Sequence, residues 1–345
     1  MSINSKKPIA KYLKFSGIFL CAAIMFFFQG CIKEKILSVT IGSSEVKGNS
    51  VTLTGAALNL STNKSFKKGF CYNTSGNPTV DDDSAIDSSP GSTIIAGLTN
   101  LKDMQQYYFT AFVEQNGELS YGEIQSFTTG KSWLNNDLSY ETIIDIDGNT
   151  YPVTTINNRK WMAENLRTTR FSNGDLITNV NSDMQWIQTT SPAWCYPNND
   201  ASKNFPNGKF YNGYTTTDSR NVCPTGWHVP TYIEWVNMLT FIDPNVINNP
   251  MGNTAGGELK SISNRFWTPP NTGAGNQTGF SATGADLRQD SSAFNQYGYG
   301  AYWWSSDLSG LVGQWYIELS TYHARANVDI FSPTMGLSVR CIQNQ

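Results

Sequence analysis

Apolar and polar residues alternate in short runs through the first part of the chain. The runs 38–41, 51–54 and 107–113 change character from one residue to the next, and clusters of turn residues separate such runs. Period-two alternation puts every second side chain on one face of a strand. Several short strands of this kind, separated by regular turns, are typical of a sandwich of two antiparallel sheets. We therefore expect a small all-β sandwich before about residue 130.

One stretch of the chain follows the helical period instead. Thr231 and Glu234 have the spacing of a capping box, in which the threonine hydroxyl accepts the N–H of Glu234 and the carboxylate bonds back to the first residue. Asp243 and Pro244 form a stop signal. We expect a helix between these two signals. Its apolar face would comprise Tyr232, Trp235, Val236 and Leu239.

An uncharged apolar run, residues 15–28, follows a lysine-rich start. The run is shorter than the about 20 apolar residues that span a membrane, and its basic flank is typical of a secretory signal. The Gly30-Cys31 pair that follows resembles the cleavage box of bacterial lipoproteins. We expect a signal peptide at 1–30, lipidation at Cys31 and a tether at 31–35. More than one acyl chain on that cysteine would give a lasting membrane anchor.

The composition changes near residue 130. All ten tryptophans lie at or beyond Trp133, and the segment 128–136 is polar. Such a shift marks a boundary between domains. We therefore expect a first domain at 36–129, a linker at 130–139 and a second domain at 140–345.

Charge excludes one large class of partner. Loss of residues 1–30 removes four lysines and no acidic residue, which changes the formal net charge from −3 to −7. A mildly acidic chain with scattered basic residues lacks the basic patch that nucleic acid requires. Charged residues make up 15% of the chain and aromatic residues 13%, a composition that indicates a secreted globular protein rather than a disordered one.

Leu101 and Tyr107 carry a more specific signal in the first domain. The leucine precedes by six residues a tyrosine that begins an alternating strand. This arrangement resembles the tyrosine corner of fibronectin type III and other immunoglobulin-like domains. The resemblance covers residues 36–129 and implies an immunoglobulin-like sandwich that acts as a spacer.

The second domain contains eight ordered sequence blocks. In this order they closely resemble the Fibrobacter succinogenes major paralogous domain, an extracellular module that is often found on lipoproteins and has no established common activity. The resemblance covers nearly all of residues 140–343. The blocks begin at Asn158, Trp194, Gly208, Gly256, Asn271, Gly279, Tyr302 and Gly336, and the stretch that begins at Cys223 lies between the third and the fourth.

This resemblance implies an α+β domain with long loops, related to C-type lectin domains and to formylglycine-generating enzymes. Cys223 and Cys341 match the positions of the outer disulfide of C-type lectin domains. The resemblance therefore implies a bridge between them. Cys195 then has no obvious partner, and Cys71 is expected to be a buried thiol.

The sequence Asp145-Ile-Asp147-Gly-Asn invites a calcium-loop interpretation. That loop requires glycine at its sixth position and glutamate at its twelfth, where this chain has Thr150 and Ile156. A tight hairpin turn explains the same residues without a metal.

Catalytic chemistry finds little support in the residue pattern. His228 and His323 are the only histidines, and the chain has no histidine or cysteine spacing typical of a metal site. The cysteine pair with which formylglycine-generating enzymes bind copper is also missing. We expect no catalytic residue, no metal and no cofactor, and therefore a protein that is not an enzyme.

A binding module fits the pattern better. Aromatic and polar residues in the loops of the second domain are suited to sugars or other polar ligands, so we expect a lipoprotein on the cell surface that recognises glycans or host or matrix proteins. A periplasmic location remains an alternative. An extracellular enzyme related to formylglycine-generating enzymes, or an accessory protein of a glycan hydrolase, is the alternative function. The candidate ligand-binding residues are Asn271, Tyr302, Trp303, Trp304, Asp307, Trp315 and Arg325.

Overall fold

The structure is a computed structural model that describes residues 36–61, 63–310 and 313–345. The expected signal peptide, the tether and the lipidation site Cys31 lie outside these residues. The described chain is mostly β-sheet with few helices. Within it, no helix combines the length and apolar character needed to cross a membrane.

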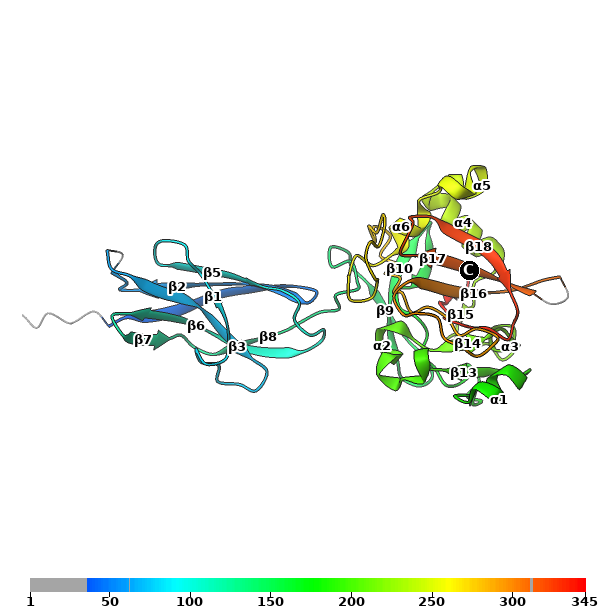
Figure 1. The fold of residues 1–345 in the computed structure, drawn as a ribbon, viewed down its shortest axis with the longest axis horizontal. Coiled ribbons are helices and arrows are strands. Elements are labelled where there is room, and N and C mark those ends of the chain that lie inside the picture. Colours follow the sequence, from blue (N-terminus) through cyan, green and yellow to red (C-terminus); the bar gives the residue numbers. More distant parts are fainter. Residues whose placement is uncertain (1–35, 62, 311–312) are drawn as a thin grey trace, which may run out of the picture. The chain divides into compact units, whose positions relative to one another are not determined.

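Residues 38–128 form two antiparallel sheets (Figure 1). The first has the strand order β1-β2-β5, and the second has the order β4-β3-β6-β7 with β8 also paired to β6. Buried and exposed residues alternate most regularly in β5, where every second residue is buried. The strands are β1 Ser38–Lys47, β2 Ser50–Leu58, β3 Phe66–Asn73, β4 Asp83–Ile86, β5 Thr93–Leu98, β6 Gln106–Gln115, β7 Glu118–Tyr121 and β8 Gln125–Thr128.

The core of this region is made only by residues between Leu37 and Phe127. Tyr107 is part of it, and its ring stacks on that of Phe127 with 5.6 Å between the ring centroids. The hydroxyl of Tyr107 accepts a hydrogen bond from the backbone N–H of Lys102 at 3.1 Å. The bond back to the preceding loop fixes the entry into β6.

Residues 141–343 form three further sheets. Their strand orders are β15-β20-β11-β10-β9, β12-β13-β14-β19 and β16-β17-β18. The first contains β9 Glu141–Ile144, β10 Thr150–Ile156, β11 Arg159–Met162, β15 Trp227–His228 and β20 Ile342–Gln343. The second contains β12 Thr178–Asn179, β13 Ala193–Cys195, β14 Phe210–Asn212 and β19 Gly336–Leu337, and the third β16 Gly300–Ser309, β17 Gly313–Ser320 and β18 Ala326–Phe331.

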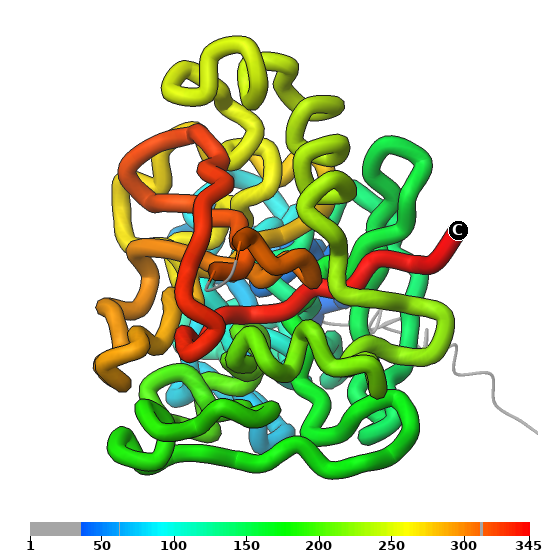
Figure 2. Tube along the Cα trace, turned by 90° about the vertical axis from the view of Figure 1, so that its right-hand side faces the viewer, coloured from blue at the N-terminus to red at the C-terminus, as the bar shows by residue number. Residues whose placement is uncertain are grey.

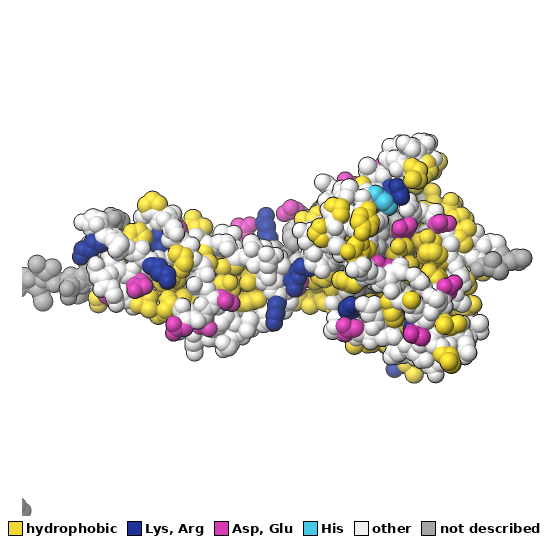
Figure 3. All heavy atoms as spheres, in the orientation of Figure 1, with side chains coloured by type: hydrophobic (Ala, Val, Ile, Leu, Met, Phe, Trp, Pro, Cys, Tyr) yellow, Lys and Arg dark blue, Asp and Glu magenta, His cyan; other side chains and the backbone are white. Residues whose placement is uncertain are grey.

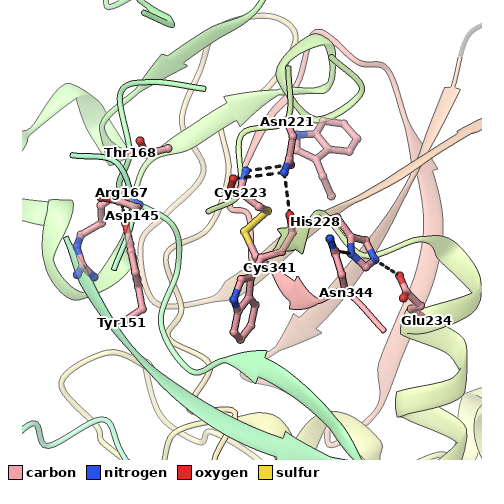
Figure 4. Close-up of a disulfide and its surroundings, with 12 residues drawn as sticks. Asp145, Tyr151, Arg167, Thr168, Asn221, Cys223, His228, Glu234, Cys341 and Asn344 are labelled. Atoms are coloured by element: carbon pink, nitrogen blue, oxygen red, sulfur yellow. Dashed lines mark hydrogen bonds and ion pairs between the residues drawn. A yellow bond between two sulfur atoms is a disulfide. The ribbon is translucent and has the colours of Figure 1, made fainter. Parts of the chain in front are cut away.

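A disulfide joins Cys223 and Cys341, as the family resemblance implied, and closes a sequence separation of 118 residues (Figure 4). Both cysteines are fully buried. In Figure 2 the C-terminal segment runs beside the segment around Trp227, in agreement with the pairing of β20 with β15. Cys71 and Cys195 are free thiols, and both are buried.

The helices of this region are short except for α4. The predicted helix is confirmed, because α4 spans Tyr232–Ile242 and both hydrogen bonds of the capping box at Thr231 are present. Helices α4, α5 and α6 lie together at one end of the region (Figure 1). The others are α1 Asp183–Gln188, α2 Asn204–Asn207, α3 Gly213–Thr216, α5 Asn245–Asn248 and α6 Ala255–Leu259.

The aspartates of the sequence Asp145-Ile-Asp147-Gly-Asn serve the protein's own backbone and side chains. Strands β9 and β10 form the expected hairpin, but its loop, 145–149, is longer than a two-residue turn. The carboxylate of Asp145 accepts from the hydroxyl of Tyr151, which lies beside it in Figure 4, at 2.6 Å. It also accepts from the backbone N–H of Asn149 at 2.9 Å. The carboxylate of Asp147 accepts from the backbone N–H of Thr169 at 2.6 Å. These bonds fix the loop.

Candidate functional site

A groove opens beside the tip of the β10–β11 hairpin. Its volume is about 750 Å³, within the range of roughly 300–1,000 Å³ that is usual for small-molecule sites. Four segments line it: the hairpin turn, the end of α4, helix α6 with the residue before it, and a loop before β16. We call it the hairpin-tip groove, and its lining residues are Thr155, Ile156, Asn157, Asn158, Phe241, Ile242, Thr254, Glu258, Gln277 and Thr278.

The hairpin turn presents two carboxamides at this groove. Ile156 pairs with Arg159, so Asn157 and Asn158 alone form the loop. Their φ angles are 50° and 57°. A two-residue turn with two positive φ angles suits the right-handed twist of a hairpin, and asparagine adopts this conformation more readily than most residues. Both asparagines are exposed, so their side chains are available to a ligand.

Helix α4 contributes an exposed aromatic ring. Trp235 and Leu239 are buried and anchor the helix on the core. Phe241 lies off that buried face and is 62% exposed. Ile242, the next residue, packs partly against the core. The end of α4 is therefore fixed while the ring of Phe241 stays open to solvent.

The side chain of Asp243 fixes the approach to α6 beside the end of α4. Its carboxylate accepts from the backbone N–H of Thr254 at 2.6 Å and from its hydroxyl at 3.0 Å. The same carboxylate accepts from the backbone N–H of Asn245 at 2.9 Å. One side chain thus holds two walls of the groove together.

Glu258 of α6 holds the third wall and has spare hydrogen-bonding capacity. Its backbone carbonyl accepts from the hydroxyl of Thr278 at 2.8 Å. Its carboxylate atom Oε2 is buried and has no hydrogen-bond partner in the described chain. A buried acceptor without a donor costs about 1–3 kcal/mol. A hydroxyl or amine of a ligand would remove that cost if the Glu258 side chain turned this oxygen toward the groove that it lines.

The lining of the groove is otherwise uncharged. It contains no lysine or arginine among the residues that the structure describes. Basic side chains are also few and scattered over the face shown in Figure 3. An anionic ligand would find no counter-charge in the groove, whereas a neutral polar ligand would find several carboxamides and hydroxyls.

A smaller cavity adjoins the groove on the other side of the turn. Its volume is about 250 Å³, and it shares Ile156, Asn157 and Asn158 with the groove. We call it the side cavity. Its other lining residues are Arg159, Trp161, Glu234, Asn237, Met238, Ile342 and Gln345.

The charges beside the side cavity are paired with one another. Arg159 Nη2 lies 2.9 Å from Glu234 Oε1. His228 Nε2 lies 2.8 Å from Glu234 Oε2, as Figure 4 shows. Burial alone would raise the pKa of Glu234, but the hydrogen bonds from His228, Thr231 and Arg159 outweigh it and lower the pKa to about 2. The bond to Glu234 and a second one to Asn344 raise the pKa of His228 above its usual value. This cluster therefore has little excess charge to offer a ligand.

Three of the candidate residues from the sequence lie in the core. Trp303 and Trp304 are fully buried, and their indole N–H groups donate to Asn165 at 2.9 Å and to the carbonyl of Tyr211 at 2.8 Å. Asn271 is 6% exposed and donates to the carbonyl of Ser261 at 2.9 Å. These three side chains are closed to solvent in this structure, so it does not present them at a surface. Their rings and amide hold strands and loops together.

The remaining four candidates do not converge on one surface. The ring of Trp315 packs on that of Tyr232 at an interplanar angle of 39°, with 4.5 Å between the centroids, and Asp307 accepts from the backbone N–H of Tyr232 at 2.7 Å. Tyr302 pairs across the sheet with Glu318, so these two side chains lie on the same face. Trp315 comes three residues before Glu318 on the same strand, so it lies on the opposite face. Arg325 donates to Asn327 at 3.1 Å. The structure brings none of these seven residues into the hairpin-tip groove.

The sequence did contain weak signals for the groove. Asn157 and Asn158 separate two alternating runs, which is a typical hairpin-turn signal. Phe241 falls off the apolar face of the predicted helix, so an exposed ring could have been expected there. Nothing local indicates that these segments lie together, because residues 155–158, 241–242, 254–258 and 277–278 meet only in the folded chain.

The comparisons with known proteins give one strong match. Residues 154–343 match the model of the Fibrobacter succinogenes major domain. No curated protein matches the chain. Solved structures of the sensor domain of the anti-sigma factor RsgI4 from Pseudobacteroides cellulosolvens show a distant similarity. A shorter form is 20% identical over 28% of this chain and 95% of its own, with a TM-score of 0.22, and a longer form is 18% identical over 32% and 100%, with a TM-score of 0.22.

Structural similarity at these TM-scores carries no argument about function. The family model, in contrast, covers more than half of the chain and includes the hairpin turn, helix α4, the groove and both cysteines of the disulfide. The chain belongs to the Fibrobacter succinogenes major domain family.

Proposed function

We propose that this protein is a binding module that recognises neutral extracellular carbohydrate in the hairpin-tip groove. The observation that carries the proposal is the groove's lining, which combines an exposed aromatic ring with the carboxamides of Asn157, Asn158 and Gln277 and no basic side chain. A sugar ring has hydroxyl groups at its rim and C–H groups on its faces. Carboxamides both donate and accept hydrogen bonds, and an aromatic ring packs on C–H groups.

Glu258 adds a charged acceptor to this set. Hydrogen bonds to a charged group are roughly twice as strong as those between neutral groups. A carboxylate with an unused oxygen therefore favours a ligand rich in hydroxyl donors. Glu258 is the one charged residue among the described residues that line the groove, so it also disfavours phosphates and uronic acids.

The rest of the chain supports display outside the cell. We propose that residues 1–30 are removed, that Cys31 is lipidated, and that the protein is anchored in the outer membrane with its domains at the cell surface. The two sheets of residues 38–128 and the hydrogen bond of Tyr107 support a fibronectin type III-like spacer. The position of the Cys223–Cys341 bridge supports a C-type lectin-like second domain. In this proposal the protein binds without catalysing a reaction.

Variants of exposed residues on α4 test whether the ligand binds in the groove. The purified protein is screened against an array of neutral and charged glycans and matrix proteins, with Phe241→Ala beside the unchanged chain. Truncation of the ring removes its packing on the sugar and is expected to weaken binding about tenfold, a loss of about 1.4 kcal/mol. Ile233→Ala is the matched control, because Ile233 lies on the same helix, is 58% exposed and does not line the groove.

Three results would contradict the proposal. The first is the absence of binding to every neutral glycan at millimolar concentration. The second is glycan binding that Phe241→Ala and Ile233→Ala weaken equally, since it would place the sugar elsewhere. The third is binding only to acidic glycans, which conflicts with a lining that contains no basic residue.

A further inference from the structure

The groove and the side cavity lie on the two sides of one hairpin turn. Both are lined by Ile156, Asn157 and Asn158, so the turn separates them and contributes to each. The side cavity, at about 250 Å³, is smaller than the roughly 300 Å³ at which small-molecule sites begin. It is therefore better suited to extend a neighbouring site than to act alone.

Helix α4 runs along both spaces. Asn237 and Met238 line the side cavity, and Phe241 and Ile242 line the groove. Asn237 and Phe241 are four residues apart, and so are Met238 and Ile242. Residues at this spacing lie on the same helix face, about 6 Å apart along the axis. This distance is close to the length of one sugar unit in an extended chain. A linear ligand that runs along α4 would place successive units beside Phe241 and beside Asn237.

Each space is lined by one residue that has a buried polar atom without a partner in the described chain. Glu258 lines the groove and has the acceptor Oε2, and Trp161 lines the side cavity and has the donor indole N–H. Trp161 is 1% exposed. Buried polar atoms of this kind are rarely left unpaired. Hydroxyl groups can donate to the first and accept from the second, directly or through a bound water.

The side cavity also matches the groove in charge. Its cation, Arg159, is bound to Glu234 at 2.9 Å and to the carbonyl of Gln343 at 3.0 Å, so it has little capacity left for an anion. Asn237 and Gln345 are exposed carboxamides. A neutral polyhydroxyl chain therefore suits both spaces.

From this arrangement we propose that the site recognises a linear neutral oligosaccharide of at least two sugar units, which lies along α4 and crosses the β10–β11 turn. The inference rests on the proposed function, and it adds that the ligand is the interior of a chain rather than a single terminal sugar. The hairpin-tip groove holds one unit, and the side cavity holds the next.

The dependence of the affinity on the length of the oligosaccharide tests this proposal. The probes are linear β-glucan, β-mannan and β-xylan oligosaccharides of one to six units, titrated calorimetrically into the purified protein. We expect the affinity for the recognised series to rise at least tenfold from one unit to three and then to level off. A single sugar would fill one space, whereas a longer chain would fill both and gain the additional hydrogen bonds.

Variants on either side of the turn separate the two spaces. Asn237→Ala removes a carboxamide from the side cavity alone and is expected to lower the affinity for trisaccharide about fivefold, the effect of one hydrogen bond, and so to flatten the length dependence. Asn158→Gly keeps the positive φ of the turn while it removes the shared carboxamide, and it is expected to weaken trisaccharide binding as well. Asn116→Gly is its matched control, an exposed asparagine with a φ of 56° in the β6–β7 turn.

The outcomes are distinct. Equal affinity for one unit and for longer chains, or an Asn237→Ala variant whose length dependence is unchanged, would overturn the two-unit site and leave the proposed function intact. Binding to none of the oligosaccharides would overturn both proposals. Binding of an extended peptide in place of every sugar, weakened by the same variants, would overturn the ligand class.

Discussion

Asp286 offers a quantitative test of the structure. Its side chain is 3% exposed, and its φ of 65° lies in the left-handed region. Burial, with a smaller contribution from the negative charge of Glu318, raises the pKa of Asp286 to about 7. Asparagine has nearly the same shape, tolerates positive φ and cannot ionise. Asp286→Asn therefore removes the charge with little change in packing.

The size of the expected gain in stability follows from the coupling between proton binding and folding. The usual pKa of this carboxyl group is 3.8, and one unit of difference corresponds to about 1.36 kcal/mol. Because the folded-state pKa is raised, the folded chain binds the proton more tightly than the unfolded chain. Stability is therefore greatest below about pH 4 and falls as the pH rises to about 7, by roughly 4 kcal/mol in total for this one group. At pH 8 the asparagine variant is expected to be about 2–4 kcal/mol more stable than the unchanged protein.

Guanidinium denaturation at pH 4.5 and pH 8, followed by tryptophan fluorescence, measures this difference. All ten tryptophans lie at or beyond Trp133, so the signal reports on the region that contains Asp286. The gain should be large at pH 8 and small at pH 4.5. Asp290→Asn, at an exposed carboxylate four positions later, should change stability little at either pH. A variant that is equally destabilised at both values would refute a buried, proton-binding carboxyl group.

Three further predictions concern stability. Cys223→Ala with Cys341→Ala opens a separation of 118 residues and should cost about 5 kcal/mol in chemical denaturation, and a loss below about 1 kcal/mol would contradict the chain-entropy argument. Lys68→Met leaves the carboxylate of Asp87 buried without its partner at 3.0 Å, so circular dichroism during heating should show a loss of about 3–5 kcal/mol, and an unchanged midpoint would argue against this buried pair. The pKa of His228 is raised in the folded protein, so its contribution to stability is full below about pH 6.5 and is lost as the pH rises through the folded-state pKa. His228→Gln should therefore lower the free energy of unfolding more at pH 5.5 than at pH 9. Equal losses at the two pH values would exclude this linkage.

Local sequence signals predicted local structure well. The capping box at Thr231 formed as expected because both of its hydrogen bonds lie within one turn of helix. Alternation predicted strands at 38–41, 51–54 and 107–113, which lie in β1, β2 and β6. The bridge between Cys223 and Cys341 required the family resemblance, since spacing alone allows several pairings.

The binding surface could not be read in the same way. An aromatic residue in a loop or strand has the same sequence signal whether it is buried or exposed, and Trp303 and Trp304 are both fully buried even though they alternate on one strand. That strand is covered on both faces, so alternation did not identify an open side. The hairpin-tip groove depends on tertiary contacts such as the one between Asp243 and Thr254, which no local pattern encodes.

The place of β20 in its sheet constrains the order in which this region can fold. Ile342 pairs with His228 on one side and with Trp161 on the other, so this late segment is an interior strand of the sheet. The sheet cannot close until residue 342 has been synthesised, and the bridge at Cys341 cannot form before the same moment. Residues 141–343 therefore complete their sheet only after the last strand is made, whereas the core of residues 38–128 needs no residue beyond Phe127.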